Sequence, residues 1–114
     1  MLFFMRAMVG VTTRGILLKE SERRLRFATD RFRTRIREVD VILRDVNGPQ
    51  GGIDKLCRVT ARLHKGGALE IEETRENFVS AIRAAAKRLR SALVRRLGGK
   101  VKAARRHSRQ RRVG

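Results

Sequence analysis

The segment around Lys65-Gly66-Gly67 constrains the fold most, because apolar and polar side chains alternate on both sides of it. A period of two residues is that of a β-strand with one buried face, and glycines mark the turn between two such strands. The apolar positions are Cys57, Val59, Ala61 and Leu63 before the turn, and Leu69 and Ile71 after it. The pattern therefore predicts a β-hairpin with one face in a core.

The alternation also suggests a register for this hairpin. Pairing residue 64 with residue 68 places Leu63 opposite Leu69 and Ala61 opposite Ile71. The same pairing places Arg62 opposite Glu70 on the outer face, where opposite charges attract. A slip by one residue would lose all of these pairs together, so we predict this register.

Two further strands precede the hairpin. Residues 2–9 form a short apolar run, which predicts a strand that is either buried on both faces or half-buried at a sheet edge. From Ile36 the period is again two, and a loop over residues 45–54 contains the only proline and several glycines. The last three strands should therefore form an antiparallel meander.

Two segments have a helical period instead. Residues 14–32 carry an apolar stripe at steps of three and four, and Thr12 or Thr13 could cap that helix. The final helix has a cap expected at Thr74, Glu76 in its first turn and a stop at Gly98-Gly99. The stripe of the first helix consists of Leu17, Ser21, Leu25, Ala28 and Phe32. The stripe of the final helix consists of Phe78, Ile82, Ala85, Ala86, Leu89, Leu93 and Leu97.

The predicted order is β-α-β-β-β-α, an α+β fold with a four-stranded sheet. Both helices should pack on one face of the sheet, since the strands are apolar on one side only. A chain of 114 residues accommodates one such domain, which we place at residues 1–97. Residues 98–114 are predicted to form a basic, disordered tail.

The distribution of charge carries the strongest functional signal. From Arg75 onward the chain holds fourteen basic residues and one acidic residue, Glu76, and the net charge of the whole chain is +18. Such a surface favours nucleic acid first and an anionic membrane surface second. On the last helix, the rotation per residue places Arg83, Lys87 and Arg90 on one flank of the apolar stripe and Arg88 and Arg95 on the other.

Aromatic residues are scarce: the chain has five Phe, no Trp and no Tyr. This weighs against a protein that stacks exposed bases on aromatic rings. It favours recognition of the nucleic-acid backbone and shape through Arg and Lys.

The sequence offers no assembled catalytic or metal site. Cys57 and His64 lie seven residues apart on one strand and therefore face opposite sides of the sheet. Glu70, Glu72 and Glu73 form the densest acidic group, in which Glu70 and Glu72 are better explained as outer-face strand residues that pair with Arg62 and its neighbours. The glycines of 48–52 match no phosphate-binding motif. We therefore predict no catalytic residue, metal ligand, cofactor or small-molecule substrate.

The cellular location can be inferred from the cysteine content and from the apolar start of the chain. A single cysteine excludes an internal disulfide, which fits a reducing cytoplasm. The apolar start at residues 1–9 is broken by Arg6 and is shorter than the ~20 residues of a membrane span, and no basic leader precedes it. We expect a cytoplasmic protein with no membrane segment.

The final helix and one loop resemble a known family, that of the ribosome hibernation-promoting factors and ribosome-associated inhibitors. The helix runs Phe78-Val79-Ser80-Ala81-Ile82-Arg83, then Lys87-Arg88-Leu89 and Arg95-Arg96. Arg88 stands at a basic position of the family, whereas Arg83 and Lys87 replace acidic residues. The loop from Asp45 to Arg58 is similar to one in short bacterial members. The resemblance is good over residues 36–97 and poor over the first helix, and the chain resembles the short form, which lacks a dimerisation domain.

The resemblance implies binding to the small ribosomal subunit, in the channel used by messenger and transfer RNA, with inhibition of translation in idle cells. The oligomeric state is left open. The basic side chains expected to contact rRNA phosphates are Arg23, Arg24, Arg83, Lys87, Arg88, Arg90, Arg95 and Arg96.

Two other functions compete with this hypothesis. The first alternative is a general RNA- or DNA-binding α+β module without ribosome specificity, which the charge alone would support equally well. The second is a small enzyme acting on nucleic acid, which ranks lowest because no acid, base, nucleophile or metal set is assembled in the sequence.

Overall fold

The computed structural model describes residues 1–7, 15–46 and 55–98. These residues form an α+β fold in the predicted order β-α-β-β-β-α, with one added turn of 3-10 helix (η1) after the first helix. The elements are β1 (Leu2–Ala7), α1 (Gly15–Thr29), η1 (Asp30–Phe32), β2 (Ile36–Asp45), β3 (Lys55–Leu63), β4 (Ala68–Arg75) and α2 (Phe78–Leu97).

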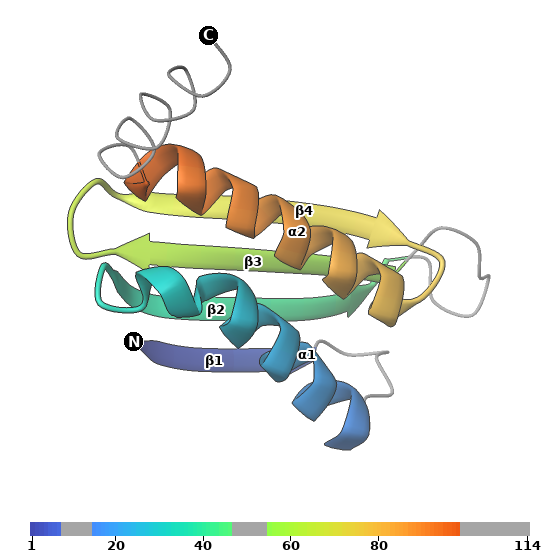
Figure 1. Cartoon of the computed structure of the whole chain (residues 1–114). Coiled ribbons are helices and arrows are strands. Elements are labelled where there is room, and N and C mark those ends of the chain that lie inside the picture. Colours follow the sequence, from blue (N-terminus) through green and yellow to red (C-terminus); the bar gives the residue numbers. More distant parts are fainter. Residues whose placement is uncertain (8–14, 47–54, 99–114) are drawn as a thin grey trace, which may run out of the picture.

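The sheet has the strand order β1-β2-β3-β4 (Figure 1). β2, β3 and β4 form the predicted antiparallel meander, whereas β1 pairs with β2 in parallel. A parallel neighbour requires a crossover connection, and α1 lies in that connection. β1 is an edge strand with Phe3 and Met5 against the core and Leu2 and Phe4 exposed, so the half-buried alternative is the correct one.

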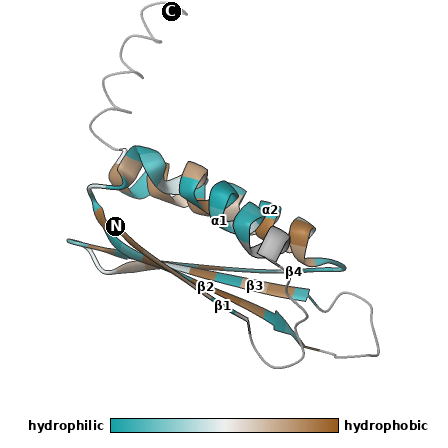
Figure 2. Cartoon of the chain, turned by 90° about the horizontal axis from the view of Figure 1, so that it is seen from below, coloured by the Kyte–Doolittle hydropathy of each residue, from teal (hydrophilic) through white to brown (hydrophobic). Residues whose placement is uncertain are grey.

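Both helices cover the same face of the sheet, as predicted, and no described helix covers the other face (Figures 1 and 2). The core between the layers is built from the inward positions of the strands and the apolar stripes of the helices. Val39, Val41 and Leu43 of β2 are fully buried, as are Leu25 of α1 and Leu89 of α2. The period-two and helical patterns therefore predicted the core faces correctly.

The predicted hairpin register is wrong by two residues. In the structure Ala61 lies opposite Leu69 and Val59 opposite Ile71, so Arg62 does not face Glu70. Gly66 and Gly67 both have positive φ, of 96° and 82°, and either glycine can supply the left-handed residue of a short turn. A shift of two residues keeps every side chain on its own face, so the alternation could not distinguish the two registers.

The cross-strand charges follow the observed register. Arg58 contacts Glu72 at 2.7 Å and Glu70 at 3.3 Å on the outer face of the sheet. Arg62 lies 3.7 Å from Glu38 of β2 instead of facing Glu70. Glu70 and Glu72 of β4 were correctly assigned to the outer face, but the arginine that pairs with them is Arg58 and not Arg62.

The start of the last helix also differs from the prediction. Thr74 and Arg75 still belong to β4, and the cap is Asn77, whose side chain accepts a hydrogen bond from the Ser80 amide at 2.8 Å. Glu76 precedes the helix and is not in its first turn. Both Asn and Thr are good helix caps, so the residue that caps α2 depends on where β4 ends. The predicted stop is confirmed, since the Gly98 amide caps the helix on the Val94 carbonyl at 2.9 Å.

The stripe predicted for residues 14–32 is buried where its side chains are described, at Ser21, Leu25 and Ala28 of α1 and at Phe32. The α-helix ends at Thr29 and not at residue 32, and Phe32 belongs to η1. The caps expected at Thr12 or Thr13, most of the predicted loop and the basic tail fall on residues 8–14, 47–54 and 99–114, which lie outside the described residues. The domain division at residue 97 therefore stays a prediction.

Candidate nucleic-acid interface

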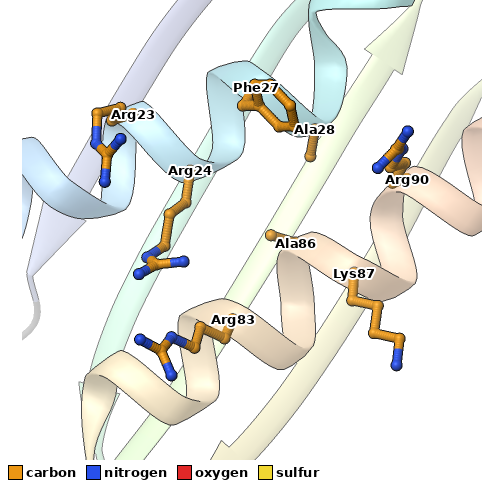
Figure 3. Close-up of a pocket in the computed structure, with 8 residues that line it drawn as sticks. All are labelled: Arg23, Arg24, Phe27, Ala28, Arg83, Ala86, Lys87 and Arg90. Carbon is orange, nitrogen blue, oxygen red and sulfur yellow. The ribbon is translucent and has the colours of Figure 1, made fainter.

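A groove of about 470 Å³ runs between α1 and α2 on the side of the helices away from the sheet (Figure 3). Five of its eight described lining residues are basic, and none of the eight is acidic. The lining consists of Arg23, Arg24, Phe27, Ala28, Arg83, Ala86, Lys87 and Arg90. Five of the eight predicted contact residues are thus gathered along one surface.

The helical period explains how this groove forms. On α1, burial of Ser21, Leu25 and Ala28 leaves Arg23 and Arg24 beside the seam with the other helix. On α2, burial of Ile82, Ala85 and Leu89 leaves the flank with Arg83, Lys87 and Arg90 facing the same seam, as the sequence predicted. Ala28 and Ala86 have small side chains, which keep the groove open between the longer basic ones (Figure 3).

The two helices differ in how their groove arginines are neutralised. On α1, Glu20 contacts Arg23 at 2.7 Å and Arg24 at 3.1 Å. The hydrogen bond from Arg23 and the charges of both arginines lower the pKa of the Glu20 carboxyl. On α2, no ion pair within the described part of the chain involves Arg83, Lys87 or Arg90. The α2 side of the groove therefore presents positive charge that no described carboxylate offsets.

The other flank of α2 faces β4. A second hollow, of about 440 Å³, is lined there by residues that include Glu73, Arg75, Lys87, Arg88 and Arg95. Arg88 forms an ion pair with Glu73 and donates a hydrogen bond to the Glu72 carbonyl at 3.1 Å. Arg75 contacts the same Glu73 carboxylate at 2.6 Å. This flank is consequently a mixture of charges that holds α2 to the sheet.

The pKa of the Glu73 carboxyl reflects its contacts with Arg75 and Arg88. Burial by itself would raise its pKa, but the hydrogen bonds and charges of Arg88 and Arg75 outweigh burial, and the pKa is lowered. Arg88 is thus engaged within the molecule, as is Arg96, which donates a hydrogen bond to the Gly66 carbonyl at the β3–β4 turn. Of the three remaining predicted contacts, Arg88 and Arg96 have structural partners and Arg95 lines the second hollow.

One groove residue was not predicted from the sequence. Phe27 has 77% of its surface exposed, although it is a large apolar side chain, and it lines the groove beside Ala28. Its exposure could have been inferred from its position off the apolar stripe of α1, one residue before the buried Ala28.

The two residues considered for chemistry, Cys57 and His64, differ in exposure. Cys57 is fully buried and His64 is exposed. Burial, together with the negative charge of Glu73, raises the pKa of the Cys57 thiol to about 12, so the thiolate that would act as nucleophile or ligand is not formed near neutral pH. No cluster of three or more potential metal ligands occurs in residues 1–7, 15–46 and 55–98.

None of the described helices is long and apolar enough to cross a membrane.

Fold and surface together define a small α+β protein with a basic groove between its two helices. Residues 16–100 match the family model described as sigma 54 modulation protein / S30EA ribosomal protein, and the chain belongs to this family. The family is one of ribosome-associated modulation factors. The match includes α1, the segment in which the resemblance seen in the sequence was poor.

Two solved structures share the fold. The ribosomal subunit interface protein from Coxiella burnetii has a TM-score of 0.67 at 18% identity, over 90% of this chain and 99% of that one. The N-terminal domain of Thermus thermophilus Protein Y has a TM-score of 0.62 at 20% identity, over 82% of this chain and 92% of that one. No curated protein sequence matches the chain.

Proposed function

We propose that this protein binds the small ribosomal subunit through rRNA phosphates and blocks translation by occupying the channel of messenger and transfer RNA. The observation that carries the proposal is the α1–α2 groove, in which five basic side chains meet without a lining carboxylate. Guanidinium and ammonium groups in such an arrangement attract phosphates and need no reaction chemistry to do so.

Membership of a ribosome-associated family suggests that the partner of this basic groove is the ribosome. Among the structural neighbours, one is a ribosomal subunit interface protein, which supports a location between the subunits. A protein in the channel would work in the cytoplasm as a hibernation factor, with no cofactor and no small-molecule substrate. Its affinity would depend steeply on salt, because binding releases the counterions of each neutralised phosphate.

The first test is sedimentation of the purified protein with separate small and large subunits, at low and at moderate salt. We expect the protein to sediment with the small subunit, to remain bound at moderate salt, and to be displaced by tRNA. Equal binding to both subunits, or loss of all binding at moderate salt, would contradict the proposal. That result would favour the alternative of a general RNA- or DNA-binding module, which the charge of the groove also supports.

A further inference from the structure

The most exposed large apolar side chain of the described residues, Phe27, lies in the most basic groove. A single exposed apolar residue is common on protein surfaces and needs no explanation alone. The setting of Phe27 is different, because all the charged residues that line the groove with it are cationic. A flat apolar ring beside cations matches a nucleotide, which has a planar base and an anionic phosphate.

The other aromatic rings of the described residues are already occupied or lie elsewhere. Arg26 lies 4.8 Å from the centre of the Phe3 ring, and Arg31 lies 5.2 Å from that of Phe32. Phe78 packs against the core, and Phe4 is exposed on the outer face of the sheet, away from the groove. No cation–ring contact within the described residues involves Phe27, so its ring is available to a base.

We propose that the groove binds an unpaired RNA nucleotide, with its base stacked on Phe27 and its neighbouring phosphates held by Arg23, Arg24, Arg83 and Arg90. This proposal rests on the proposed function and specifies which form of RNA the site takes. Bases inside an A-form duplex are closed to a side chain of this kind, whereas bases in loops, bulges and single strands can stack on it. Stacking tolerates any base, so the site selects unpaired RNA and not a sequence.

The absence of tryptophan and tyrosine from the chain permits a direct test. In the variant Phe27→Trp the new indole is the only strong fluorophore, and its high exposure predicts an unchanged fold. Titration with a single-stranded RNA of about ten nucleotides should quench its emission, because a stacked base contacts the indole. The matched control is Phe4→Trp, which places the same fluorophore on the outer sheet face and should not be quenched.

Affinity measurements provide the second arm. Phe27→Leu keeps an apolar side chain but removes the ring, and we expect it to weaken binding of the single strand by about tenfold. The salt dependence of binding should not change, since no charge is lost, and binding of an RNA duplex of equal length should be unaffected. Phe4→Leu should match the original protein in every measurement.

Two results would overturn the proposal: emission of the Phe27→Trp variant that stays constant at saturating RNA, or equal affinity of Phe27→Leu and the original chain for the single strand. Sedimentation of the original protein with small subunits, measured on the same preparation, separates this failure from that of the proposed function. If the protein sediments with small subunits but the RNA does not quench the indole, the stacking proposal is wrong and the proposed function still stands. Quenching without co-sedimentation supports the stacking and defeats the ribosomal partner.

Discussion

The α1–α2 groove and the outer face of the sheet are both rich in arginine, yet they differ in what their arginines contact. On the outer face Arg6 contacts Asp40 at 2.8 Å, Arg58 contacts two glutamates, and Arg62 lies near Glu38. In the groove, Arg83, Lys87 and Arg90 have no ion pair among the described residues. The comparison separates arginines that are paired within the sheet from the cations on the α2 side of the groove, which have no described acidic partner.

The largest effect should come from neutralising the α2 side of the groove. The triple variant Arg83→Gln/Lys87→Gln/Arg90→Gln should bind small subunits on the order of a hundredfold more weakly near 0.1 M salt, with a salt slope reduced by about three. Sedimentation or filter binding over a salt series measures both quantities. The stability of the fold should not decrease, because none of the three side chains has a described acidic partner.

The matched control removes equal charge elsewhere. Arg35, Arg44 and Lys65 are exposed and do not line the groove. The triple variant Arg35→Gln/Arg44→Gln/Lys65→Gln should lose less than about threefold in affinity, through the weaker long-range field alone. Equal losses in the two triple variants would show that only total charge matters and would remove the distinction between the surfaces.

The second effect concerns the flank of α2 that faces β4, where charge serves stability. Glu73→Gln should lower the free energy of unfolding by about 1 kcal/mol near neutral pH, since Arg75 and Arg88 lose their shared carboxylate. A carboxyl with a lowered folded pKa stabilises the fold above its unfolded pKa, about 4.3, and loses that contribution as the pH falls through the folded value. The difference between the variant and the original chain should therefore disappear in acid.

Denaturant unfolding at neutral and at acidic pH measures this difference. Glu70→Gln is the control, because Glu70 is an exposed strand glutamate whose side chain has 60% of its surface accessible. It should change stability by less than about 0.5 kcal/mol at either pH. A Glu73 effect that persisted unchanged in acid would exclude the ion pairs as its cause.

A smaller effect should follow from removing Glu20, the one carboxylate among the described residues that pairs with groove arginines. Glu20→Gln releases Arg23 and Arg24 from their shared partner. We expect RNA affinity to rise about threefold at low salt, and the salt slope to steepen, as two more cations become available to phosphates. Filter binding with single-stranded RNA checks this, with Glu22→Gln, which pairs with Arg26 outside the groove, as the control. Reduced affinity of Glu20→Gln would mean that Glu20 positions its arginines for binding.

The smallest effect lies on the outer face. A double-mutant cycle on Arg58 and Glu72 should give a coupling of about 0.5 kcal/mol that weakens with salt, as is usual for exposed cross-strand pairs. RNA affinity should change little in any member of the cycle. A coupling of several kcal/mol would indicate that the outer face is a structural network and not a solvated surface.

Much of the fold could be predicted because its signals are local. The alternation in Val39, Val41 and Leu43 and the helical stripe through Ile82 and Leu89 depend only on neighbours in the sequence, and burial confirms both. The flanks of α2 followed from the same helical rotation. By contrast, the hairpin register and the helix cap at Asn77 depended on choosing between chemically equivalent options, and both predictions were wrong.

The sequence alone determined the order of the elements, the side of each that enters the core and the excess of basic residues, because these follow from the strand and helix periods and from composition. The tertiary structure decided which cations of α2 have partners within the molecule, because those partners are distant in the chain. Arg88 meets Glu73 across fifteen residues, and Arg96 meets the Gly66 carbonyl across thirty. It also decided that Phe27 of α1 shares a groove with the basic flank of α2, since only packing of the two helices brings these segments together.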